Sequence, residues 1–220
     1  MVGFLKKLGI KLTLSQIDMI KMKQEKIIKI CLSQLVEFPI EDIFNQMLDV
    51  LKIKLDPIQV QKFCDFFKRK IICEIRDEVY DVLKEIKDLD LISGVISNSF
   101  VDAPRVILER ADLMKFLDVV VLSRDVCVRK PHPKIFLYAT EKAGVSPKES
   151  LFIGDVYEID VWGAKNVGMV AVLMANEKEQ GAWRELVRKY TPRPHILPQP
   201  DHKISNLREV LEILRHYYEF

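Results

Sequence analysis

The chain has 220 residues, of which 49% are hydrophobic, so it can bury the core of one ordinary domain or of a domain with a modest insertion. The charged fraction is 30%, but 34 basic residues nearly balance 32 acidic ones and the net charge is only +2. Lys and Arg recur beside Asp and Glu, which is typical of solvated helix faces. Since no basic surface stands out, nucleic acid is not an expected partner.

The cysteines are scattered among apolar neighbours and form no C-x-x-C pair, which favours small buried side chains over a zinc site or a disulfide. They are Cys31, Cys64, Cys73 and Cys127. No run approaches the ~18–20 apolar residues that span a bilayer. The segment Met1–Leu8 is too short, and too soon interrupted by Lys6 and Lys7, for a signal peptide. We therefore expect a cytoplasmic protein with no membrane partner.

The first part of the chain, residues 1–76, has a helical pattern and almost no strand signal. Apolar residues recur at helical spacing over Ile17–Val36, Ile43–Leu51 and Val60–Ile71. Pro39 and Pro57 fall at or near helix starts, where a missing N–H costs little. The pattern predicts a bundle of three or four helices.

The second part, residues 77–220, alternates helices with short apolar strands. Such alternation indicates βαβ units, a parallel sheet and the α/β class. A proline-rich irregular stretch, 192–200, precedes a last amphipathic helix at 206–217. The expected strands are 91–97, 119–122, 150–154 and 169–174, and the other expected helices are 78–87, 104–116, 133–143 and 158–167.

Polar side chains follow three of these strands. They are Ser97-Asn98-Ser99, then Arg129-Lys130-Pro131-His132-Pro133, then Gly154-Asp155 with Glu158 and Asp160. Ligands of open α/β sheets bind beyond the carboxyl ends of the strands. A hydroxyl and a lysine can bind phosphate oxygens there, and carboxylates can hold Mg²⁺. The sequence thus predicts an anion and metal site at this edge.

These residues resemble motifs of a known family. Ser97 after a strand, Lys130-Pro131, and Gly154-Asp155 with Asp160 five residues later are similar to motifs II, III and IV of the haloacid dehalogenase superfamily. Order, spacing and strand context all agree, and the resemblance extends over residues 77–220. It implies a Rossmann-like parallel sheet with flanking helices, and it makes residues 1–76 an all-helical cap over the site.

The resemblance also implies roles. Ser97 and Asn98 would bind the phosphoryl group, and Lys130 would bind it and stabilise developing charge. Asp155 and Asp160 would hold Mg²⁺, so that Ser97, Lys130 and Asp160 take part in catalysis. By contrast, we interpret Tyr157 and Glu158 as helix-start residues and His132 as the residue that precedes a helix, without chemical roles.

One motif of the family is missing. Its first strand ends in Asp-x-Asp, which carries the nucleophile, and lies at the centre of the sheet. Here the first acidic residue, Asp18, sits within a helical pattern with no second Asp two residues later. The true start of the chain upstream, a non-catalytic homologue, or a substitute strand at Met1–Leu5 would each explain this. We expect the first.

Three functions remain open. The first is a Mg²⁺-dependent phosphatase of a small phosphorylated metabolite that works through an aspartyl-phosphate. The second is a metal-independent 2-haloacid dehalogenase, and the third is an inactive homologue that binds a ligand. Gly154-Asp155 favours the phosphatase, because dehalogenases of the family usually lack this pair.

Overall fold

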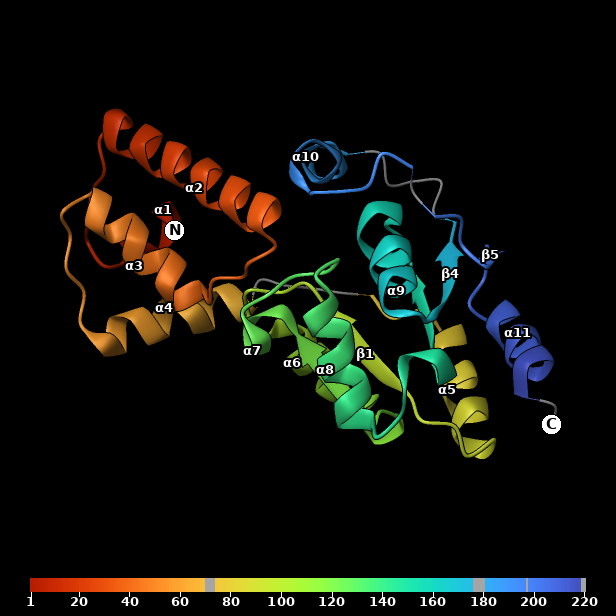
Figure 1. Cartoon of the computed structure of the whole chain (residues 1–220). Coiled ribbons are helices and arrows are strands. Elements are labelled where there is room, and N and C mark those ends of the chain that lie inside the picture. The colour runs from red at the N-terminus through yellow and green to blue at the C-terminus, as the bar shows by residue number, and fades with distance from the viewer. Residues whose placement is uncertain (70–73, 176–180, 197, 219–220) are drawn as a thin grey trace.

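The computed structural model describes residues 1–69, 74–175, 181–196 and 198–218. Its first four helices, which we call the cap helices, gather on one side of the molecule, away from the strands (Figure 1). The predicted helical bundle is thereby confirmed, whereas the boundary at residue 76 stays a prediction. The cap helices are α1 (Val2–Lys7), α2 (Leu14–Gln34), α3 (Ile40–Val50) and α4 (Pro57–Arg69).

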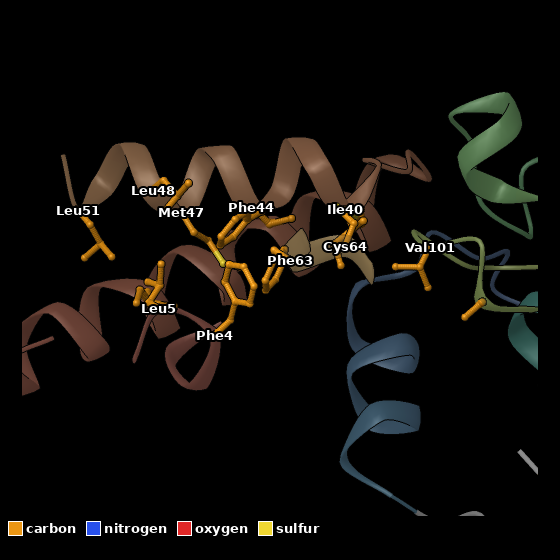
Figure 2. Close-up of a cluster of buried hydrophobic side chains, with 14 residues drawn as sticks. Phe4, Leu5, Ile40, Phe44, Met47, Leu48, Leu51, Phe63, Cys64 and Val101 are labelled. Carbon is orange, nitrogen blue, oxygen red and sulfur yellow. The ribbon is translucent and has the colours of Figure 1, made fainter. Parts of the chain in front are cut away.

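Aromatic rings fill the interior of the cap helices (Figure 2). Phe44 of α3 is fully buried and stacks on Phe63 of α4, with ring centroids 3.7 Å apart. Phe4 of α1 meets the Phe63 ring edge-on at 5.4 Å. Edge-on and stacked rings add a favourable electrostatic contact to apolar burial. This cluster is what joins α1, α3 and α4.

The rest of the chain alternates strands and helices. Parallel pairing is confirmed throughout, and Gly144 and Gly168 end helices in the left-handed conformation. The strands are β1 (Gly94–Ser97), β2 (Val119–Leu122), β3 (Leu151–Gly154), β4 (Val170–Met174) and β5 (His202–Ile204). The helices are α5 (Glu78–Asp88), α6 (Ala103–Arg110), η1 (Met114–Phe116), α7 (Ser123–Val126), α8 (Pro133–Ala143), η2 (Pro147–Glu149), η3 (Tyr157–Val161), α9 (Trp162–Val167), α10 (Ala182–Tyr190) and α11 (Glu209–Tyr218).

The strands form two separate sheets instead of one. Strand β1 pairs with β2, and β3 pairs with β4, which pairs with β5. A cleft of about 730 Å³ is lined by Gly94–Ile96 of β1 and by Leu151–Ile153 of β3. No strand among the described residues pairs with either of these two edges. The resemblance places the missing first strand at the centre of the sheet, and the break agrees with that expectation.

One predicted helix is shorter than expected, and one explanation for the missing motif is excluded. The alternative of a substitute strand at Met1–Leu5 is excluded, because Val2–Lys7 is helical. The helix expected at 104–116 ends at Arg110, and Asp112 has a positive φ of 54° before η1 begins. The helix expected at 158–167 is present as η3 and α9, and its first turn is the wider π-helical one. Helix α10 was not predicted although its apolar residues recur at helical spacing, and β5 is only three residues long.

The aromatic cluster gives a stability prediction. Replacing Phe44 with alanine leaves a cavity beside Phe63, and we expect the free energy of unfolding to fall by about 3–5 kcal/mol. Urea denaturation followed by circular dichroism measures the change. Leu14→Ala, at an 82% exposed position of α2, is the control and should stay within about 0.5 kcal/mol of the parent. Equal losses in both variants would contradict the packing described above.

Candidate active site

A cavity of about 550 Å³ lies between the cap helices and the carboxyl ends of β1 and β3. Four of the five predicted site residues line it, namely Asn98, Lys130, Asp155 and Asp160. The fifth, Ser97, ends β1 next to Asn98 but is not part of the lining. The expected clustering at one edge of the strands therefore holds for most of the site.

Lys130 and Asp160 form a shielded ion pair in this cavity. The Lys130 Nζ lies 2.8 Å from Asp160 Oδ1, and the two side chains are 12% and 5% exposed. The same ammonium group lies 5.0 Å from the centre of the Phe152 ring, which adds a cation–π contact. Removal of water strengthens such a charge pair, so the ammonium group is held in one place.

Asn98 binds the backbone of Lys130 on both sides. Its Oδ1 accepts from Lys130 N at 2.7 Å, and its Nδ2 donates to Lys130 O at 3.1 Å. Both polar atoms of the amide are thus engaged within the chain. Asn98 positions Lys130, and its predicted direct contact with substrate stays a prediction.

Gly154 makes room for Asp160. A Cβ at position 154 would lie 2.2 Å from the Cβ of Asp160, which is closer than any real contact. The π-helical turn η3 brings Asp160 to this place, where Asp160 Oδ2 accepts from Val156 N at 3.0 Å. The glycine of the fourth motif is therefore required by the packing of the Asp160 carboxylate, six residues later.

Asp155 is the more accessible carboxylate, with a side chain that is 42% exposed. An Nη2 of Arg184 donates to its Oδ2 at 3.1 Å and to its backbone oxygen at 3.2 Å. Arg184 comes from α10, so the sequence reasoning that missed α10 missed this partner too. The signal that could have found it is the amphipathic run over Ala182–Tyr190, where apolar residues recur at helical spacing.

A buried ion pair closes the other side of the cavity. Glu37 follows α2, and its Oε2 accepts from Arg129 and, at 2.6 Å, from the Ser123 hydroxyl. The chain segments run antiparallel here, since Glu37 N donates to Cys127 O and Arg129 N to Leu35 O. Burial, and next the charge of Glu37, raise the pKa of the Cys31 thiol. Sequence reasoning gave Glu37 no role, because its partner lies 92 residues away.

His132, Tyr157 and Glu158, which we interpret as having no chemical role, make structural contacts. His132 precedes α8, and its Nδ1 accepts from Lys134 N at 3.1 Å. Burial, with the charge of Lys134 beside it, lowers the His132 pKa. Glu158 pairs with Arg188 of α10, and the Tyr157 hydroxyl donates to Pro198 O. None of these three residues lines the cavity.

The carboxylates fit a Mg²⁺ ion that keeps most of its water. Mg²⁺ sites commonly use one or two carboxylates, several waters and the phosphate of a substrate. The Asp155 side chain is 42% exposed, whereas Asp160 is buried, with Oδ1 in the ion pair with Lys130 and Oδ2 bound by Val156 N. No group of three or more His, Cys, Asp or Glu side chains suited to a metal occurs in the described ranges. Asp155 would therefore bind directly and Asp160 through water.

The cavity also lacks a spare carboxylate for nucleophilic attack. Among its described lining residues, the acidic ones are Glu37, Asp155 and Asp160. Glu37 is paired with Arg129 and Asp160 with Lys130, while Asp155 is the metal candidate. Among the described lining residues, no carboxylate therefore replaces the nucleophile of the missing Asp-x-Asp.

The close approach at Gly154 gives a second prediction. In Gly154→Ala the new methyl group displaces Asp160 and separates it from Lys130. We therefore expect the free energy of unfolding, measured by urea denaturation, to fall by about 1–3 kcal/mol. Gly3→Ala is the matched control, because nothing lies within 4 Å of its Cβ. That helix position should gain up to about 1 kcal/mol. If Gly154→Ala had the same free energy of unfolding as the parent, Asp160 would not be packed against Gly154.

Comparison with known proteins shows which family the chain resembles over most of its length. The family described as haloacid dehalogenase-like hydrolase matches residues 8–175, and so includes most of the cap helices. The glyceraldehyde 3-phosphate phosphatase of Methanopyrus kandleri is 30% identical over 138 residues, which are 63% of this chain and 55% of that protein. The pyrimidine 5'-nucleotidase YjjG of Escherichia coli is 42% identical over 90 residues, or 40% of each chain. The chain thus spans about half, or less, of the length of these relatives.

A solved structure has the same fold. The 2-haloacid dehalogenase of Pseudomonas syringae pv. Tomato DC3000 superposes with a TM-score of 0.65 at 22% identity, over 96% of this chain and 84% of that one. At this identity the likeness concerns the fold alone. Since the family match extends over more than half of the residues, the chain belongs to the haloacid dehalogenase-like hydrolases.

Proposed function

We propose that this chain provides the phosphate- and metal-binding part of a Mg²⁺-dependent phosphatase that acts on a small phosphorylated metabolite. The observation that carries the proposal is the shielded Lys130–Asp160 pair beside the exposed Asp155, at the carboxyl ends of two parallel strands. The relatives named as a glyceraldehyde 3-phosphate phosphatase and a nucleotidase support the reaction class.

Each residue has a part in this proposal. The Lys130 ammonium neutralises phosphate charge and stabilises the charge that develops in transfer. The Ser97 hydroxyl donates a hydrogen bond to a phosphate oxygen, and Asn98 keeps Lys130 in place. Asp155 and Asp160 hold Mg²⁺, which supplies further positive charge when bound. Closure of the cap helices over the cavity excludes water, as lids commonly do.

Binding tests this assignment without turnover. In isothermal titration of residues 1–220, we expect Mg²⁺ and inorganic phosphate to bind together. Asp155→Asn should lower Mg²⁺ affinity, and Lys130→Met should lower phosphate affinity, each by about tenfold or more, because each removes a charged ligand group. Asp18→Asn is the control, since that carboxylate is exposed on α2. Equal affinities in Asp155→Asn and Asp18→Asn would refute the metal assignment.

The reaction still requires a nucleophilic carboxylate, and we propose that a further strand between β1 and β3 carries it. Both flanking strands are parallel members of their sheets, with one unpaired edge each within the described chain. Such a strand, running parallel to them, would end at the same edge as Ser97 and Gly154. Met1 lines the same cavity as Lys130 and Asp155, so a short connection would suffice.

A strand added before Met1 tests this. We expect an extension made of an apolar strand that ends in Asp-x-Asp, joined by a short linker, to give Mg²⁺-dependent hydrolysis of p-nitrophenyl phosphate. The matched extension that ends in Asn-x-Asp should bind phosphate but release none, because an amide cannot form the acyl phosphate. Halide release from a 2-haloacid without Mg²⁺ would indicate the dehalogenase instead. Phosphate binding with no turnover in either extension would favour a binding protein.

A further inference from the structure

The cavity has two chemically different ends. Its core end holds the polar groups described above, namely Asn98, Lys130, Asp155 and Asp160. Its cap end is made of aliphatic and aromatic side chains from three helices. These include Ile27 and Ile28 of α2, Ile43 and Phe44 of α3, and Phe67 of α4. A ligand with its phosphate at the core end would therefore place the rest of its structure among apolar groups.

The cap end offers few hydrogen bonds to a ligand. The carboxylate of Glu37 lies on the wall but is bound by Arg129 and by Ser123. Of the cap residues that line the cavity in the described chain, Gln24 alone has a side-chain amide, and it lies at an exposed position of α2. Ligand hydroxyls buried there would lose water without gaining partners, which costs affinity.

The size and shape of the cavity support the same conclusion. A volume of about 550 Å³ falls in the usual range for drug-sized ligands and exceeds what a phosphate group alone needs. Aromatic side chains also occur at the core end, where Trp183 lines the wall with a side chain that is 46% exposed. Aromatic side chains offer large apolar contact areas and can pair with a ring of a ligand in stacked or edge-on geometry.

We propose that the substrate is a phosphate monoester of an apolar alcohol, with an aromatic or branched aliphatic body, and that the cap helices select it against polyhydroxylated phosphates. The proposal rests on the proposed function, because it assumes that the phosphate lies beside Lys130. It assigns specificity to side chains of α2, α3 and α4, and it makes Ile43 a specificity-determining residue.

The test is a comparison of affinities on residues 1–220, where the lack of a nucleophile prevents turnover. Isothermal titration with Mg²⁺ present would compare phenyl phosphate, 3-methylbutyl phosphate, glycerol 3-phosphate and inorganic phosphate. We expect the two apolar esters to bind at least tenfold tighter than glycerol 3-phosphate. Each buried methylene contributes about fourfold, and each unpaired hydroxyl costs about tenfold.

Matched variants locate the effect. Ile43→Asn puts an amide in the cap wall, and we expect it to lower phenyl phosphate affinity about tenfold while inorganic phosphate affinity stays unchanged. Met22→Asn makes the same change at a 71% exposed position of α2 and should change neither affinity. If Ile43→Asn does not fold, as judged by circular dichroism, Ile28→Asn replaces it at another part of the same wall.

The outcomes separate the two proposals. If inorganic phosphate binds but glycerol 3-phosphate binds as tightly as the apolar esters, the apolar selection is refuted while the phosphate site stands. If Ile43→Asn lowers the affinities for phenyl and inorganic phosphate equally, the specificity role of Ile43 is refuted. If no phosphate compound binds, the phosphate site itself is refuted, and the selection with it.

Discussion

The buried pair of Glu37 and Arg129 joins the cap helices to the strands, and the candidate site depends on it. Neither charge is stable alone in this interior, because removing one partner of a buried pair typically costs about 3–5 kcal/mol. The Ser123 hydroxyl completes the contact. Arg129 immediately precedes Lys130, so the segment that contacts the cap helices also presents the Lys130 ammonium group to the cavity. The contact between the cap helices and Arg129 therefore also helps to position Lys130.

A second constraint acts on the strands. Backbone N–H and C=O groups that are buried away from water need hydrogen-bond partners, and in sheets these come from the neighbouring strand. The edges of β1 and β3 that line the 730 Å³ cleft have no strand partner in the described chain. The cleft is lined mostly by apolar side chains, which solvate such groups poorly. The proposed strand between β1 and β3 would supply these hydrogen bonds and the Asp-x-Asp together.

Within the cavity, the charged and the apolar side chains come from different parts of the chain. The polar groups come from loops at the ends of β1, β2 and β3, where parallel strands deliver them to one edge. The apolar wall comes from helices of a different part of the chain, whose remaining apolar side chains form the aromatic cluster around Phe44. The polar end and the apolar wall can therefore vary independently of each other on one fold.

The sequence by itself determined the class of the fold, most helices and strands, and the residues of the polar end, because apolar periodicity and motif spacing are local properties. Pro133 and Gly144, for example, bound α8 as expected. Tertiary structure alone decided the partners: that Asn98 holds the backbone of Lys130, that Arg184 meets Asp155, and that Glu37 neutralises Arg129. It also decided that Val2–Lys7 is helical rather than a substitute strand, since that segment packs its Phe4 against Phe63. Contacts between residues 29 to 92 positions apart depend on packing, and no local pattern encodes them.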